Sequence, residues 1–215
     1  WKNIQFNALA KNEISLKKCS HMQYQKIFFL AILISISAVL ISNQLQSTDN
    51  ISILVNNSGP FIGTSISYQS GYDGSGIVVS IIDTGIDLNH PDLEGQIIGG
   101  YDFVDNDEMP EDTNGHGTQV AGIIASNGNL KGIAPNSKIL MYKVSEDGES
   151  VPSHLIIKAI EKSIEDNADI INISLGINQT NTKIDQVVNK AVKNNIFVVT
   201  AAGNFGPELS TIGSP

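Results

Sequence analysis

The sequence predicts an α/β fold in which a doubly wound, mostly parallel sheet is flanked by helices. From about residue 70 onward, apolar β-branched runs alternate with amphipathic segments, and this alternation is typical of a parallel sheet with helices on both faces. The strand candidates are continuous apolar runs, which indicates that both faces of the sheet are buried. With 41% hydrophobic residues among 215, the chain can build a sizeable core.

Each predicted element follows from local periodicity, because strands show β-branched runs and helices show apolar residues at helical spacing. In the helix predicted from 154 to 168, for example, Leu155, Ala159 and Ile160 share one face and charged residues occupy the other. In chain order the predicted elements are a strand at 76–83, a helix at 118–126, a strand at 138–144, the helix at 154–168, a strand at 169–176, a helix at 182–195 and a strand at 196–204.

An isolated apolar run, IFFLAILISISAVLIS at 27–42, follows Lys26 and precedes a polar stretch. Its length is typical of the apolar region of a signal peptide and is short for a membrane span. We expect a signal peptide, with an uncleaved membrane anchor as the alternative, and therefore a secreted or cell-surface protein that meets the membrane only through this segment. A buried core helix is a weaker interpretation, because the run stands apart from the other apolar segments.

The numbered chain starts at Trp1, whereas Met22 opens the segment that holds the apolar run. We therefore expect four parts along the chain. These are upstream read-through or a non-native extension at 1–21, the signal peptide or anchor at 22–46, a linker or short pro-segment at 47–67, and a catalytic-type domain at 68–215.

Composition argues against several functional classes. The net charge of −9 disfavours a nucleic-acid partner, which normally requires a basic patch. The single cysteine, Cys19, excludes a disulfide within the chain and a cysteine-based zinc site. A nucleotide-binding fold is disfavoured because no Gly-x-Gly-x-x-Gly follows a predicted strand.

Polar residues gather where the predicted strands end. Asp83 ends the first strand, Ser174 lies near the end of a later one, Asn204 follows the last, and His116 stands between two glycines at a helix start. Singly, each has an ordinary explanation as a turn, cap or packing residue. Together at the carboxyl edge of one sheet, they suggest acyl transfer, in which an aspartate orients a basic imidazole and an amide holds the oxyanion.

Five stretches in order resemble the subtilisin-like serine proteases, the subtilases, over residues 68–215. The resemblance implies a subtilisin-like fold that is incomplete at its C-terminus, and a peptide or protein as substrate. The five stretches are VVSIIDTGIDLNHPDL (78–93), NGHGTQVAGIIAS (114–126), KGIAPNSKILMYKV (131–144), ADIINISLG (168–176) and VVTAAGN (198–204).

The resemblance also implies roles for individual residues. Asp83 corresponds to the orienting acid, His116 to the general base and Asn204 to the oxyanion-hole amide. The stretch Ser174, Leu175 and Gly176 resembles the strand that pairs with substrate backbone, and residues 143–148 resemble a second substrate-facing strand. Ile177 and Gln119 depart from the family pattern, which has glycine and histidine there, and Ile177 is expected to narrow or reshape the substrate pocket.

The nucleophile motif of the family, Gly-Thr-Ser-x-Ala-x-Pro, does not occur in the sequence. The only Gly-Thr-Ser, in GTSIS at 63–67, lacks the alanine and proline. We therefore expect an N-terminal fragment of a serine endopeptidase that is inactive alone, or alternatively a non-catalytic remnant that binds calcium or peptide. The aspartic-protease triplet at 83–85 is a further alternative, but those enzymes need two such carboxylates on an all-β scaffold.

The stretch YDFVDNDEMPED at 101–112 crowds six acidic residues into twelve. A solvated acidic loop explains the composition, whereas the spacing of the carboxylates suits calcium, which prefers hard oxygen ligands. The stretch resembles a calcium loop of thermitase-like subtilases. That resemblance implies a structural calcium ion held by the side chains of Asp102, Asp105, Asp107 and Glu111 and the carbonyl of Met109.

Overall fold

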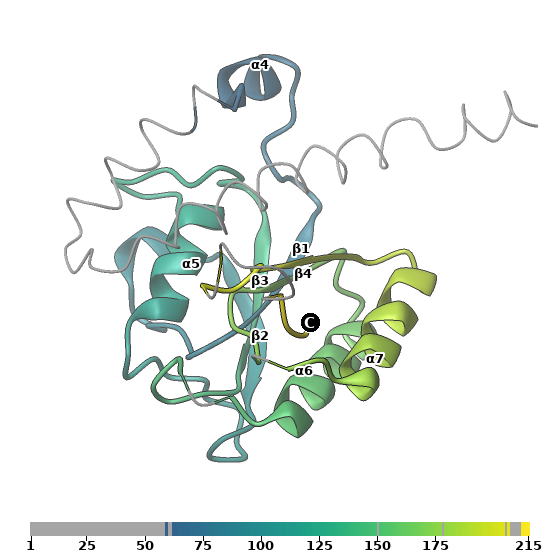
Figure 1. The fold of residues 1–215 in the computed structure, drawn as a ribbon. Coiled ribbons are helices and arrows are strands. Elements are labelled where there is room, and N and C mark those ends of the chain that lie inside the picture. The colour runs from purple at the N-terminus through teal and green to yellow at the C-terminus, as the bar shows by residue number, and fades with distance from the viewer. Residues whose placement is uncertain (1–58, 60–61, 150, 178, 205, 207–211) are drawn as a thin grey trace, which may run out of the picture.

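Figure 1 shows the fold in a computed structural model, which describes residues 59, 62–149, 151–177, 179–204, 206 and 212–215. The expected signal peptide or anchor and most of the expected linker lie outside these ranges. Within them, no helix is both long enough and apolar enough to cross a bilayer.

One sheet of five strands organises the described part of the chain. Its spatial order is β2-β3-β1-β4-β5, and every neighbouring pair is parallel. This confirms the predicted α/β class. The strands are β1 (Val78–Asp83), β2 (Ile97–Asp102), β3 (Lys138–Lys143), β4 (Ile170–Ile173) and β5 (Phe197–Thr200).

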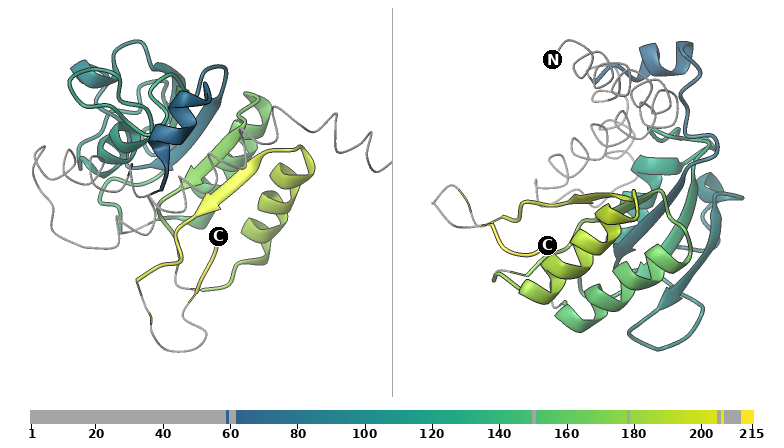
Figure 2. Two further views of the ribbon diagram at one scale, coloured as in Figure 1. Left: turned by 90° about the horizontal axis from the view of Figure 1, so that it is seen from above. Right: turned by 90° about the vertical axis from the view of Figure 1, so that its right-hand side faces the viewer.

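Helices cover both faces of this sheet. Helix α5 (His116–Ala125) lies on one face, and α6 (Ser153–Glu165) and α7 (Thr182–Lys193) lie together on the other (Figures 1 and 2). Alternate residues of each strand pack on opposite sides. The α5-side cluster includes Val79, Ile81 and Met141 with Val120 and Ile124, and the α6–α7-side cluster includes Ile82, Tyr142 and Ile171 with Ile156 and Ile184.

The connection through α5 has an unusual hand. The crossovers β2–α5–β3, β3–α6–β4 and β4–α7–β5 all advance in one direction across the sheet, yet α5 lies on the opposite face from α6 and α7 (Figure 1). The α5 crossover is therefore of opposite hand to the other two. Since about 98% of parallel crossovers are right-handed, this one departure separates α5 from α6 and α7.

Three short elements were not predicted, namely α4 (Thr64–Gln69), the 3-10 helix η1 (Pro91–Leu93) and β2. Helix α4 spans the expected boundary between linker and domain, and the Tyr68 hydroxyl donates to the carbonyl of Gly132 at 2.9 Å. Strands β4 and β5 are shorter than predicted and end at residues 173 and 200. Ser174 and Asn204 therefore lie in loops beyond the strand ends.

Candidate active site

Alternation along β1 directs Asp83 toward the α5 face, because Val79 and Ile81 share its parity and pack in the α5-side cluster. Its side chain is fully buried, and its Oδ1 lies 2.7 Å from Nδ1 of His116. The same oxygen accepts the N–H of Thr84 at 2.7 Å. The predicted acid and base, 33 residues apart in sequence, thus form one hydrogen-bonded pair.

The pair changes the proton affinity of the imidazole. Burial alone would lower the pKa of His116, but the hydrogen bond and charge of Asp83, together with the charge of Asp112, outweigh it and raise the pKa above its ordinary value. The cause is stabilisation of the imidazolium by nearby carboxylates. An imidazole in this environment accepts a proton more readily than a solvated histidine does.

The two glycines beside His116 serve different purposes. Gly115 adopts a left-handed φ of +100° just before α5, a conformation that strains residues with a β-carbon. At Gly117, a β-carbon would overlap the carbonyl oxygen of Gly85. Glycine at position 117 therefore lets α5 approach the loop after β1.

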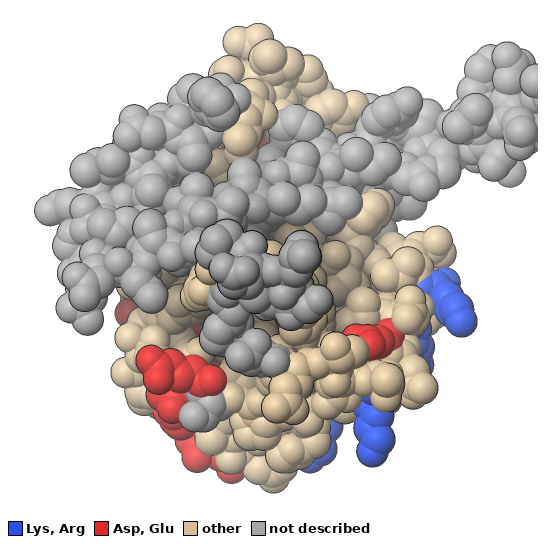
Figure 3. Space-filling view, viewed as in Figure 1, with Lys and Arg blue, Asp and Glu red and all other residues tan. Residues whose placement is uncertain are grey.

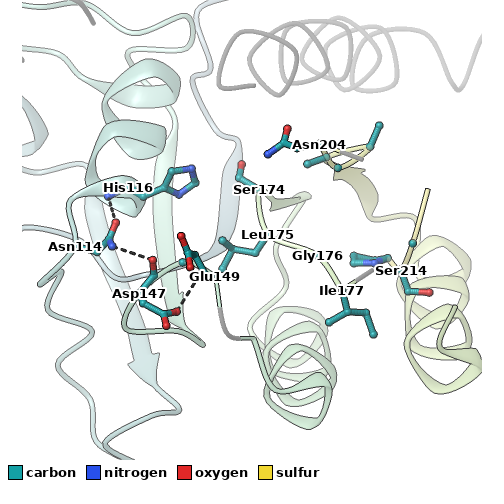
Figure 4. Close-up of a pocket in the computed structure, with 16 residues that line it drawn as sticks. Asn114, His116, Asp147, Glu149, Ser174, Leu175, Gly176, Ile177, Asn204 and Ser214 are labelled. Atoms are coloured by element: carbon teal, nitrogen blue, oxygen red, sulfur yellow. Dashed lines mark hydrogen bonds between the residues drawn. The ribbon is translucent and has the colours of Figure 1, made fainter. Parts of the chain in front are cut away.

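A pocket of about 450 Å³ opens beside the imidazole. In Figure 4, His116 stands on one side with Asn114, Asp147 and Glu149, and the second side is formed by Ser174 and Asn204 with the chain toward Gly176 and Ser214. The structure therefore brings the predicted base, the predicted oxyanion amide and the predicted substrate strand to one cavity. The full lining is Asn114, His116, Asp147, Gly148, Glu149, Ser174, Leu175, Gly176, Ile177, Ala201, Ala202, Gly203, Asn204, Gly213, Ser214 and Pro215.

Ser174 reaches this pocket because it follows Asn172 on the α5 face of β4. Asn172 is fully buried, and its Nδ2 donates to Ser174 Oγ at 2.9 Å. Ile177 pairs with Ser214 through two backbone hydrogen bonds of 2.8 and 3.2 Å. The Ile177 side chain packs against the α6–α7-side cluster and points away from the opening in Figure 4. Ile177 nevertheless lines the pocket, so the expectation that it narrows or reshapes the pocket stays a prediction.

Comparison with known proteins gives this arrangement a family. Residues 74–215 match the profile of the subtilase family, peptidase family S8. The chain belongs to the subtilase family.

Individual relatives agree with this assignment. The minor extracellular protease Vpr of Bacillus subtilis (strain 168) is 40% identical over 183 residues, which cover 79% of this chain and 23% of that protein. Thermitase of Thermoactinomyces vulgaris is 41% identical over 138 residues, or 62% of this chain and 50% of thermitase. The subtilase described here thus spans half or less of the length of these relatives.

A solved structure shows the same fold. A cold adapted subtilisin-like serine proteinase superposes with a TM-score of 0.57 at 36% identity, covering 62% of this chain and 48% of that one. The predicted subtilisin-like fold is thereby confirmed for the described part of this subtilase.

The acidic loop of this subtilase does not gather into a metal site among the described residues, where no three Asp, Glu, His or Cys side chains converge. Asp102 is buried, its Oδ1 accepts the N–H groups of Val104 and Asp105 at 2.7 and 2.9 Å, and its Oδ2 lies 3.4 Å from Nζ of Lys143. Asp107 Oδ1 accepts the N–H of Met109. The carboxylates of Asp105, Asp107 and Glu111 belong to exposed residues.

The Asp92 side chain is held by the short loop after α5. Its Oδ1 accepts the N–H of Asn129 at 2.6 Å, and its backbone carbonyl accepts the N–H of Asn127 at 2.7 Å. The carboxylate is therefore hydrogen-bonded to the backbone of the short loop.

Sequence reasoning missed the acidic residues near His116. Glu149 lines the pocket as part of a loop attached to the His116 loop, since Asn114 Nδ2 donates to the carbonyl of Asp147 at 3.1 Å and Thr113 Oγ1 donates to Glu146 Oε2 at 2.7 Å. Only the family comparison of residues 143–148 hinted at this side of the pocket.

Proposed function

We propose that this subtilase is a serine endopeptidase that hydrolyses peptide bonds by acyl transfer. The observation that supports it best is the 2.7 Å contact between Nδ1 of His116 and Oδ1 of the buried Asp83, beside a pocket that also contains Asn204. The nucleophile in this proposal is a serine of the family motif, which the 215 residues do not contain.

The geometry supports the following proton transfers. When Asp83 accepts a hydrogen bond from Nδ1–H, the other ring nitrogen, Nε2, is left unprotonated and can take the proton of the attacking serine. Asp83 then stabilises the imidazolium without itself taking the proton. The Asn204 side chain donates its amide N–H to the oxyanion, and loss of one such donor typically lowers kcat by about 100- to 1000-fold.

In the same proposal, the substrate backbone pairs with residues 174–176, since these follow β4 without a neighbouring strand over that length and strand addition supplies backbone hydrogen bonds. Two acidic side chains, Asp147 and Glu149, and no lysine or arginine line the pocket. We therefore expect the protein to prefer peptides that place a lysine or arginine on the His116 side of the pocket. Glu149→Gln should reduce that preference several-fold while activity on neutral peptides persists, and an unchanged ratio of kcat/KM values would contradict this assignment.

The main experiment measures peptide hydrolysis by the full-length protein. His116→Ala should abolish turnover, and Asp83→Asn should lower kcat by about 10⁴-fold because the imidazole loses its orienting partner. His154→Ala is a matched control, since His154 is exposed on α6 and does not line the pocket. Turnover retained by His116→Ala overturns the proposed mechanism. Peptide binding without hydrolysis in the unmodified full-length protein would favour the non-catalytic alternative.

Secretion is a further part of the proposal, based on the apolar run after Lys26. Relatives include proteases named as extracellular and as intracellular, so cell fractionation with N-terminal sequencing of the mature protein is the deciding test. An intact N-terminus in the cytoplasmic fraction would refute secretion.

Calcium binding at the acidic loop is the remaining part, supported by the oxygen chemistry of Asp102, Asp105, Asp107 and Glu111. An ion there would offset the repulsion among these carboxylates and stabilise the loop that leads to His116. Because the Asp102 carboxylate already contacts Lys143 and two backbone N–H groups, the loop must rearrange to hold the ion. Chelation should lower the melting temperature, and an unchanged Tm with no calorimetric binding signal would refute the site.

A further inference from the structure

We propose that Asp112 is a positioning residue that fixes Asp83 and His116 relative to each other. This inference rests on the proposed function, and it assigns a role that neither the family match nor the sequence motif supplied. Asp112 contacts neither the imidazole nor the buried carboxylate by a hydrogen bond in the described structure. It acts through the residues that flank both.

The carboxylate of Asp112 joins the two chain segments that carry the pair. Its Oδ1 accepts the hydroxyl of Thr84 at 2.9 Å and the N–H of Gly115 at 2.8 Å. Its Oδ2 accepts both the N–H and the hydroxyl of Thr118, at 2.9 and 2.5 Å. Thr84 directly follows Asp83, and residues 115 and 118 bracket His116 in sequence.

Thr84 closes the connection from the other side. Its hydroxyl oxygen accepts the N–H of Gly117 at 2.9 Å while its proton goes to Asp112. A single hydroxyl is thus oriented by both the helix start and the carboxylate. Because two amides beside His116, those of Gly115 and Gly117, are bound within this network, the imidazole has little freedom to move away from Asp83.

The charge of Asp112 suits this position. The Asp112 carboxylate accepts four hydrogen bonds, from the hydroxyl groups of Thr84 and Thr118 and the N–H groups of Gly115 and Thr118. An anion at the start of α5 is stabilised by the helix dipole. The other acidic groups near His116 are Asp83 on β1 and, on the same side of the pocket as the imidazole, Asp147 and Glu149.

The test compares Asp112→Asn with the unmodified full-length protein. The variant keeps the shape, but its amide NH₂ cannot accept a hydrogen bond, so the donors lose their acceptor either on the side of Thr84 and Gly115 or on the side of Thr118. We expect kcat to fall by about 10- to 100-fold, as for a misplaced catalytic group, with KM unchanged. The acidic limb of kcat/KM should move to lower pH, because the pKa of His116 falls when a nearby negative charge is removed.

A second pair of variants separates positioning from simple loss of structure. Thr84→Val removes the hydroxyl that joins the segments and should give a similar loss in kcat, whereas Thr84→Ser should recover most of it. The double variant Asp112→Asn with Thr84→Val should be little worse than either single variant, because both break one connection. Asp166→Asn is the control. The Asp166 carboxylate also accepts hydrogen bonds from two side chains, but it does not line the pocket.

Titration of the His116 ring by NMR gives a readout that does not require turnover. If no variant or wild-type protein hydrolyses peptides, the proposed function fails, yet a lowered pKa of His116 in Thr84→Val, which breaks the connection without removing a charge, still supports positioning. An unchanged kcat with an unchanged titration overturns the inference. So does a loss of activity that matches the unfolded fraction by circular dichroism and leaves the pH profile unmoved.

Discussion

Replacing the buried Lys143 should destabilise the fold far more than replacing a surface lysine. The side chains of Lys143 and Asp102 are each only 2% exposed, and Nζ lies 3.4 Å from Oδ2. Burial lowers the pKa of Lys143, but bonding to Glu146 and the charge of Asp102 outweigh it and raise the pKa, so the amine is charged. Lys143→Met keeps most of the stem and removes the charge, which leaves the Asp102 carboxylate buried without its cation.

The magnitude follows from what Asp102 retains. Removing one partner of a buried ion pair typically costs about 3–5 kcal/mol. Because Asp102 Oδ1 still accepts two backbone N–H groups, we expect the lower end, about 3 kcal/mol. Glu146 adds little, since its side chain is 47% exposed and can be solvated. For a domain of this size, about 3 kcal/mol corresponds to a fall in Tm of roughly 6–12 °C.

Urea denaturation followed by circular dichroism measures this free energy of unfolding. The control is Lys162→Met, because Lys162 is 39% exposed and pairs with Asp166 on the surface, and such pairs contribute about 0–1 kcal/mol. The double variant Lys143→Met with Asp102→Asn should be more stable than Lys143→Met alone. The reasoning would be refuted if the free energy of unfolding of Lys143→Met lay within about 1 kcal/mol of that of the unmodified protein. It would also be refuted if the effects of the two substitutions simply added in the double variant.

Two other predictions concern His116 and its helix. The pKa of His116 is raised in the folded protein, so protonation of this ring stabilises the fold. The stabilisation is complete below the unfolded pKa of about 6.5 and is lost as the pH rises through the folded pKa. In Asp83→Asn, urea midpoints measured across this range should depend less on pH, because Asp83 is the main cause of the raised pKa. Gly117→Ala should destabilise by about 1–3 kcal/mol, since its β-carbon would overlap backbone. Gly122→Ala on the same helix meets nothing within 4 Å and should stabilise by up to about 1 kcal/mol, so equal effects of these two substitutions in thermal denaturation would be inconsistent with the close approach.

The elements that sequence predicted well are those with long, regular patterns. Helices α6 and α7 and strands β1 and β3 lie within a few residues of their predicted bounds, because their apolar periodicity matches how they are buried. Strand β2 was missed. It is an edge strand, it contains Gly99 and Gly100, and its pairing with β3 shifts register between Ile97 and Gly99, so its pattern does not resemble a buried strand.

The candidate site likewise contains residues that local sequence patterns predict and residues that they do not. Asp83 and His116 were identified because each stands in a local motif, and the sheet parity that brings them together follows from the strand prediction. Asp112 has no such signal, since one of its main partners, Thr84, lies 28 residues away and the connection exists only in three dimensions. Likewise, the contact between Asp102 and Lys143 depends on the pairing of β2 with β3, which the sequence did not reveal.

The position of α5 on the face opposite α6 and α7 has a consequence for how the protein can be engineered. Asp83 and His116 depend on the layer between α5 and the sheet, whereas α6 and α7 pack on the opposite side of the same strands. Repacking for thermal robustness can therefore be directed to the α6–α7 layer with little effect on the alignment of acid and base. For the same reason, we expect homologous proteins to accept fewer substitutions in the layer beneath α5 than in the α6–α7 layer.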